Sequence, residues 1–176
     1  MLIPLVVVLF LRVHHHYQEV RGQLSLHGLP PSLRPISPTR VAIPISGVHR
    51  GMVNAVLFAR AISSHVTGIY VELEPGSGSR VTKEWNQWWP DVPLVVIPSP
   101  YRSIVGPLLE YLDKTDQEHN DGQLAVIVLP EFVTTYWWQN LLHNQEALII
   151  KAALLYGRRR GGLERIVIDV PYHLKT

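Results

Sequence analysis

The chain has 176 residues, of which 47% are apolar and 17% charged, with a formal net charge of +2. That length allows one domain with a sizeable core plus an appendage, and the composition excludes a disordered protein. The small net charge gives no basis for nucleic-acid binding, so we expect no nucleic-acid partner. Because the sequence holds no cysteine, disulfides, thiolate catalysis and cysteine-based zinc sites are excluded.

An almost purely apolar segment, Leu2 to Leu11, lies near the start of the chain, and Arg12 and three histidines follow it. The segment is too short to cross a bilayer as a helix, which takes about 20 residues, and it lacks the features of a signal peptide. The residues alone leave two interpretations. The segment is either the cytoplasmic end of a transmembrane helix, with basic residues on the cytoplasmic side, or a hydrophobic element that docks on the domain.

The residues that follow predict a short helix and then a stiff linker. His14, His15 and His16 are adjacent, so on a helix they point in different directions, and we expect no metal site there. A short helix is expected from Tyr17 to Leu26, and the proline-rich run from Gly28 to Pro38 is typical of a semi-extended linker. We therefore place a helix and linker in residues 13–38 and a folded domain in residues 39–176.

Strand and helix patterns alternate strictly through that domain. Short β-branched runs predict strands over residues 41–45, 67–73, 92–98, 124–129 and 165–170. Amphipathic patterns predict helices over residues 50–62, 81–89, 103–119 and 135–156. Strict alternation of this kind predicts an α/β fold with a doubly wound, open, parallel five-stranded sheet.

Two of these helices carry predictions about their buried face. Trp85 and Trp88 lie three residues apart, so both are expected to pack on the sheet. The apolar residues of the helix over 135–156 that we expect to face inward are Trp138, Leu141, Leu142, Leu148, Ile149 and Leu155.

The strand ends supply candidates for a ligand site. In an open α/β sheet, ligands bind beyond the carboxyl ends of the strands, near the point where strand order reverses. Helix amino ends flanked by Arg50 and Arg102 favour an anion such as phosphate, and the ring of Tyr101 or Phe132 suits contact with a base. Each residue alone also has a structural interpretation, in which the arginines pair with Glu131 or cap carbonyl groups. The candidate ligand-binding residues are Ser46, Gly47, His49, Arg50, Ser99, Tyr101, Arg102, Glu131 and Phe132.

Enzyme signatures are missing from the sequence. It contains neither GxGxxG nor GxxxxGK[ST], so it has no dinucleotide or P-loop fingerprint. It contains no GxSxG nucleophile elbow either. We therefore expect a protein that is not an enzyme, with no catalytic residue.

The order of elements and a first strand that ends in VAIPISG resemble the universal stress protein family. That resemblance implies a sheet of strand order 3-2-1-4-5. Nucleotide-binding members carry an aspartate at the end of the first strand and a glycine-rich loop after the fourth. Ser46 stands at the first of these positions, and residues 130–145 contain no glycine, which counts against ATP binding in the usual manner.

Longer strings resemble the cytoplasmic C-terminal tail of bacterial permeases of the amino acid–polyamine–organocation (APC) superfamily, which includes potassium importers. The resemblance runs from about His14 to Leu174. It implies that residues 1–12 are the truncated end of a transmembrane helix, that residues 13–38 are a juxtamembrane helix and linker, and that residues 39–176 are a universal-stress-protein-like domain. The strings are HHHYQEVRGQLSL, VPLVVIPSPYRSIVGPLLEYLD, VIVLPEFVTTYWWQNLLHNQEALIIKAALL and VIDVPYHL.

The resemblance implies a regulatory and dimerisation domain on the cytoplasmic face of the bacterial inner membrane. Its partners would be the transmembrane transport unit of the permease, a second copy of the chain and, through the N-terminal segment, the membrane. Its candidate ligand is cyclic di-AMP or another adenine nucleotide. Two alternatives stay open: a free-standing stress-protein-like nucleotide binder, and a structural scaffold that binds no small molecule.

Overall fold

The computed structural model describes residues 2–25, 40–119, 125–133, 145–156 and 165–173. The chain divides into two compact units, Met1–Pro35 and Ile36–Thr176. The described helices and strands, in chain order, are α1 (Leu2–Gln23), β1 (Val41–Ile45), α2 (Gly51–Ile62), β2 (Val66–Glu72), α3 (Ser77–Trp88), β3 (Leu94–Pro98), α4 (Val105–His119), β4 (Ala125–Val133), α6 (Gln145–Tyr156) and β5 (Arg165–His173).

The first unit contains α1, which joins the apolar segment and the predicted short helix into one helix. The three histidines lie on it in different directions. Nε2 of His14 lies 3.1 Å from the side-chain amide of Gln18, and Nε2 of His15 lies 3.1 Å from the carboxylate of Glu19. Among the residues that the structure describes, no helix has both the length and the apolar character needed to cross a membrane, and no cluster of three potential metal ligands forms.

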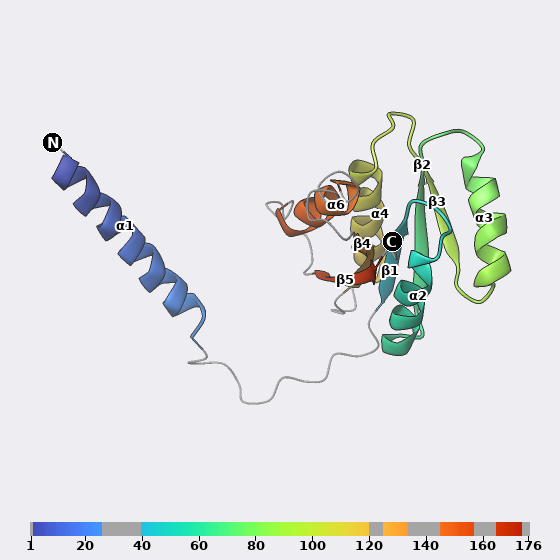
Figure 1. Cartoon of the computed structure of the whole chain (residues 1–176), viewed down its shortest axis with the longest axis horizontal. Coiled ribbons are helices and arrows are strands. Elements are labelled where there is room, and N and C mark those ends of the chain that lie inside the picture. The colour runs from blue at the N-terminus through green and yellow to red at the C-terminus, as the bar shows by residue number, and fades with distance from the viewer. Residues whose placement is uncertain (1, 26–39, 120–124, 134–144, 157–164, 174–176) are drawn as a thin grey trace. The chain divides into compact units, whose positions relative to one another are not determined.

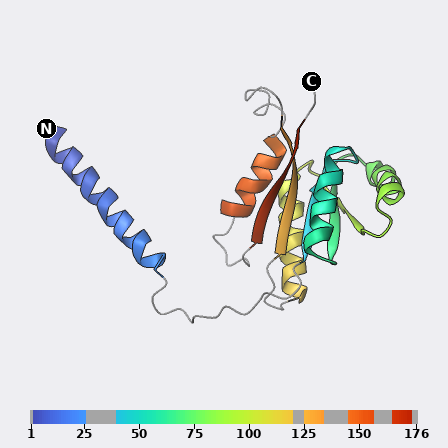
Figure 2. The ribbon, with the colours of Figure 1, turned by 60° about the horizontal axis from the view of Figure 1, so that its bottom comes forward.

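The second unit is a parallel five-stranded sheet with strand order β3-β2-β1-β4-β5. The predicted fold class and strand order are thus confirmed. Helices α2 and α3 pack on one face of the sheet and α4 and α6 on the other (Figures 1 and 2). Both faces are covered because a parallel sheet is apolar on each side.

Strand alternation divides the core into two layers. On the face of α2 and α3, Ile43 of β1 and Val128 of β4 pack with Trp85 of α3. On the face of α4 and α6, Ile127 of β4 packs with Leu108 of α4. All five side chains are essentially buried, as expected for neighbouring strand residues that point to opposite faces.

The prediction for the tryptophans of α3 was half wrong. Trp85 is fully buried, and its Nε1–H donates a hydrogen bond of 2.7 Å to the carbonyl oxygen of Val92. Trp88 is 68% exposed, and Trp89 takes the inner place instead, with its ring centroid 4.7 Å from that of Trp85. The reason is that α3 ends at Trp88 and the backbone of Trp89 leaves the helical path, so helical spacing no longer applies.

The predicted inner face of α6 was also wrong. Leu148 and Ile149 are 61% and 55% exposed, whereas Ile150 and Leu154 are buried against α4 and the sheet. The apolar residues of this helix are spread around its axis, so periodicity could not select the buried face. The other predictions for this helix, Trp138, Leu141, Leu142 and the side chain of Leu155, lie outside what the structure describes.

Strand β4 continues four residues past the predicted end at Leu129, to Val133. The added residues pair in parallel with β5, from Pro130 opposite Val170 to Val133 opposite His173. On its other side β4 pairs with β1 only at Val126 and Ile127. A proline is tolerated in such a strand because one edge no longer takes part in a ladder.

Candidate functional site

The two central strands separate toward their carboxyl ends. Their pairing stops at Ala42 opposite Ile127, and each strand then carries a proline, Pro44 in β1 and Pro130 in β4. A proline has no amide N–H, so neither residue leaves a donor without a partner where the ladder has ended. The strand order reverses between β1 and β4, which is where ligands bind in open α/β sheets.

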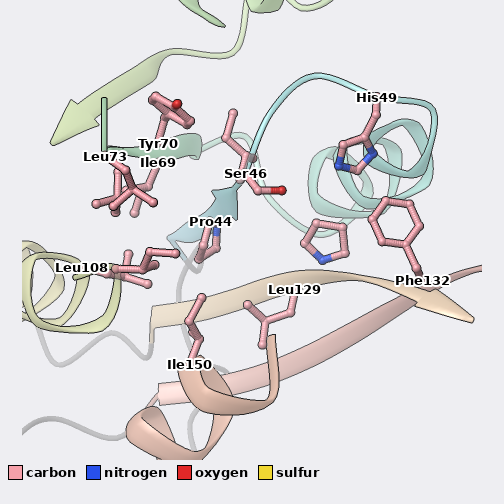
Figure 3. Close-up of a pocket in the computed structure, with 14 residues that line it drawn as sticks. Pro44, Ser46, His49, Ile69, Tyr70, Leu73, Leu108, Leu129, Phe132 and Ile150 are labelled. Atoms are coloured by element: carbon pink, nitrogen blue, oxygen red, sulfur yellow. The ribbon is translucent and has the colours of Figure 1, made fainter. Parts of the chain in front are cut away.

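A cavity of about 240 Å³ lies at this point, and both prolines line it (Figure 3). Its apolar wall comes from the strands, from Leu108 of α4 and from Ile150 of α6. Among the described lining residues none is Asp, Glu, Lys or Arg, and the polar side chains come from Ser46, His49 and Tyr70. An interior of this kind favours an uncharged ring over a phosphate, because a buried unpaired anion is costly.

His49 and Phe132 form one end of the cavity. Their ring centroids are 4.8 Å apart with planes tilted by 45°, and the ring of Phe132 meets that of Tyr172 on β5 edge to face at 6.3 Å. Burial lowers the pKa of His49, since removing the imidazolium from water disfavours the charged form. The neutral form of the His49 ring is therefore favoured.

Three of the nine predicted ligand residues, Ser46, His49 and Phe132, line the cavity. Gly47 lies on the same loop as Ser46, and Arg50 comes directly before α2 with an exposed side chain that forms no cap hydrogen bond. Neither of these two lines the cavity. A cation at Arg50 is thus one residue along the chain from the ring of His49.

The loop after β3 keeps its predicted residues out of the cavity lining. The buried Ser99 hydroxyl donates to the carbonyl oxygen of Ser103 at 2.7 Å and accepts from the Ser103 amide at 3.0 Å. The Arg102 amide donates to the Ser99 carbonyl oxygen, and Arg102 has a φ of 53°, a value uncommon outside glycine. Tyr101 is 92% exposed. The hydrogen bonds of Ser99 therefore shape this tight loop, which presents Tyr101 and Arg102 to solvent.

Glu131 lies in β4 two residues after Leu129, which belongs to the core layer of α4 and α6, so strand alternation turns its side chain to the same face. Lys151 of α6 forms an ion pair with Asp169 of β5. The hydrogen bond with Asp169 raises the pKa of Lys151, and the negative charges of Asp169 and Glu131 add to that effect. Glu131 thus contributes to the charge on the α6 side of the sheet.

Several lining residues were not among the nine candidates. Pro44, Leu108, Leu129, Pro130 and Ile150 line the cavity, but Leu108, Leu129 and Ile150 look in the sequence like ordinary core residues, and Pro130 looks like the start of a loop. The usable signal was Pro44 within the first predicted strand, because a proline inside a central strand marks a ladder that is interrupted.

Comparison with known proteins identifies the family. Residues 37–172 match the family model described as KimA potassium transporter C-terminal domain. The chain is also 30% identical over 173 residues to the potassium transporter KimA of Bacillus subtilis (strain 168). That match covers 98% of this chain and 27% of the relative, so the chain spans about a quarter of that transporter's length. The chain belongs to the family of KimA potassium transporter C-terminal domains.

Proposed function

We propose that this chain is the cytoplasmic regulatory domain of a potassium permease of the APC superfamily and that it senses an adenine nucleotide, cyclic di-AMP foremost. The family of the domain supports the transporter association. The observation that carries the sensing proposal is the uncharged cavity between the separated ends of β1 and β4. The fold itself is non-enzymatic in this proposal, and the site binds without reacting.

The size of the cavity limits what it holds. Sites for whole drug-sized ligands occupy about 300–1,000 Å³, and this cavity has about 240 Å³. It therefore suits one base of a dinucleotide, held by apolar contacts and by the rings of His49 and Phe132. The sugar and phosphate groups would remain at the rim, where Arg50 is exposed at the start of α2 and attracts an anion.

Calorimetric titration of the full 176-residue chain in mild detergent with cyclic di-AMP, ATP and cyclic di-GMP tests the sensing proposal. We expect binding of cyclic di-AMP that Ser46→Phe abolishes, because the added ring enters the cavity. Ser64→Phe is the matched control, since Ser64 is exposed in the loop between α2 and β2 and does not line the cavity. An absence of heat with both adenine ligands, or equal binding by the two variants, would contradict the proposal.

We include dimerisation in the proposed function, with β5 as the contact between two copies. β5 is an edge strand of nine residues, whereas the opposite edge strand, β3, has five. A long edge is a template for pairing with another strand, and two identical edges can pair about a two-fold axis. Apolar side chains are exposed beside it, with Ile166 at 44%, Leu148 at 61% and Ile149 at 55%.

Light scattering after gel filtration measures the mass that tests this contact. We expect a dimer whose mass falls to that of one chain in the double variant Ile166→Lys with Leu148→Asp. Trp88→Asp is the matched control, because Trp88 is 68% exposed on α3, which contacts β2 and β3 at the opposite edge of the sheet from β5. A monomeric wild type, or a dimer that persists in the double variant, would rule out this interface.

The N-terminal segment belongs to the same proposal as the cytoplasmic end of a helix of the transport unit. Its side chains from Val6 to Leu11 are 38–69% exposed on α1, and Arg12 follows them, as expected at the cytoplasmic end of a membrane helix. Co-flotation with liposomes tests membrane contact. We expect the chain to float, and to stop floating when Val8, Leu9 and Phe10 are replaced by Asp; a wild-type chain that stays with the soluble fraction would contradict it.

A further inference from the structure

The cavity contains one ring whose two nitrogens have different surroundings. Nδ1 of His49 is buried and has no hydrogen-bond partner among the residues that the structure describes. Nε2 is not buried in this way, and the ring lines the cavity beside Phe132 (Figure 3). A ligand in the cavity can therefore approach Nε2, while Nδ1 is closed to it.

The start of helix α2 determines which nitrogen carries the proton. A Cβ built on Gly51, the first residue of α2, would lie 3.2 Å from Nδ1 of His49, so this nitrogen lies at the amino end of the helix. That end carries the positive part of the helix dipole, which stabilises a lone pair and repels an N–H group. A neutral histidine has one donor and one acceptor nitrogen. The arrangement thus favours a lone pair on Nδ1 and a proton on Nε2.

We propose that His49 is the residue that selects the base, by donating an Nε2–H hydrogen bond to an accepting ring nitrogen of adenine in the cavity. This inference rests on the proposed function and adds the side chain and the atom that recognise the ligand. The donor is held in place from both sides, by Phe132 at 4.8 Å between ring centroids and by the start of α2. A rigid donor in a mostly apolar cavity discriminates strongly, because a base that offers no acceptor there leaves a buried polar group without a partner.

The tautomer of His49 is the first test, and it needs no ligand. Long-range ¹H–¹⁵N NMR spectra of the full chain in mild detergent at pH 7.5 should show a protonated Nε2 and an unprotonated Nδ1 for His49, assigned with His49→Phe. A proton on Nδ1 would overturn the inference whatever nucleotide binds, and it would leave the proposed function intact.

The second test measures the hydrogen bond itself. Analogues of cyclic di-AMP in which N1, N3 or N7 of the adenines is replaced by carbon each remove one kind of acceptor. We expect one of the three to bind wild type about 3- to 10-fold more weakly than cyclic di-AMP, and His49→Phe to lose that difference. His49→Gln should restore part of that difference, because its side-chain amide can donate near the position of Nε2. His65→Phe is the matched control and should leave the difference unchanged, since His65 is exposed and lies directly before β2.

Failure of this test is distinguishable from failure of the proposed function. If wild type binds cyclic di-AMP but no analogue loses affinity through His49, the selector role is wrong and the sensing proposal stands. If wild type binds no adenine nucleotide, the sensing proposal is wrong and the selector role falls with it.

Discussion

The imidazole of His49 lies against the ring of Phe132, and the backbone of Gly51 lies close to both rings. A Cβ on Gly51 would lie 2.9 Å from Cε1 of Phe132 and 3.2 Å from Nδ1 of His49. The three residues belong to the loop after β1, the start of α2 and the end of β4. The wall that the two rings form thus requires a glycine at position 51, because even a methyl group there would displace the rings.

Gly51→Ala should therefore displace the two rings. Alanine is favoured over glycine within a helix by roughly 1 kcal/mol, but the methyl group would overpack a buried contact, which costs about 1–3 kcal/mol. We expect no net gain in the free energy of unfolding in urea, together with shifted NMR signals of His49. Gly47→Ala is the control because a Cβ there meets nothing within 4 Å; equal His49 shifts in both variants would contradict the prediction.

At the opposite end of the strands, a buried carboxylate joins three elements. Asp116 of α4 accepts a hydrogen bond of 2.9 Å from Nε of Arg165 at the start of β5, and Nη2 of the same guanidinium forms an ion pair with it at 2.8 Å. Its second oxygen lies 3.6 Å from the guanidinium of Arg40, just before β1. The side chains of Asp116, Arg165 and Arg40 are only 6%, 9% and 17% exposed.

We expect Asp116→Ala to lower the free energy of unfolding by about 3–5 kcal/mol, since it removes the buried carboxylate shared by two buried guanidinium groups. Asp91→Ala is the matched control. Asp91 pairs with Arg60, but the two side chains are 54% and 48% exposed, and such surface pairs contribute about 0–1 kcal/mol. Urea unfolding measures the free energy of unfolding of both variants. A similar small loss in each would show that the buried ion pair stabilises the domain no more than the exposed one.

The sequence allowed the sheet to be predicted because its strands are marked locally. Val41 to Ile45 is a β-branched run of strand length, and the alternation of such runs with amphipathic helices specifies a parallel sheet. The continuation of β4 through Pro130 and Glu131 was missed because those residues are typical of a loop. Their pairing with Val170 and Pro171 of β5 is a contact between residues far apart in the chain, which local pattern does not reveal.

The candidate site could be predicted only in part, for a related reason. The rule that ligands bind at strand ends selected Ser46, His49 and Phe132 correctly as neighbours in space. It also selected Tyr101 and Arg102, because β3 ends at the same edge of the sheet. Whether a loop turns toward the cavity depends on its hydrogen bonds, here those of Ser99. The partners of a serine side chain cannot be deduced from the sequence.

Trp85 and Trp88 provide a test of how far burial differs within one helix. Trp85 is fully buried and hydrogen-bonded to Val92, whereas Trp88 is 68% exposed. We expect Trp85→Ala to lower the free energy of unfolding by about 3–5 kcal/mol and Trp88→Ala to change it by no more than about 0.5 kcal/mol. Urea unfolding followed by circular dichroism measures both, and a large loss in Trp88→Ala would indicate that its ring is covered in solution.

His49 should make the stability of the domain depend on pH. Burial lowers its pKa below the ordinary 6.5, so between these two values the unfolded chain binds more protons than the folded one. Stability from this group is fully present above pH 6.5 and is lost as the pH falls through the folded pKa, with a slope of at most about 1.4 kcal/mol per pH unit. Urea unfolding of wild type and His49→Phe at intervals between pH 7.5 and pH 5 isolates the effect, because every other titrating group is common to both proteins. We expect the free energy of unfolding of wild type minus that of His49→Phe to fall on acidification. If this quantity stayed constant or rose, folding would not disfavour the imidazolium of His49, and the wall that His49 forms with Phe132 would be open to solvent.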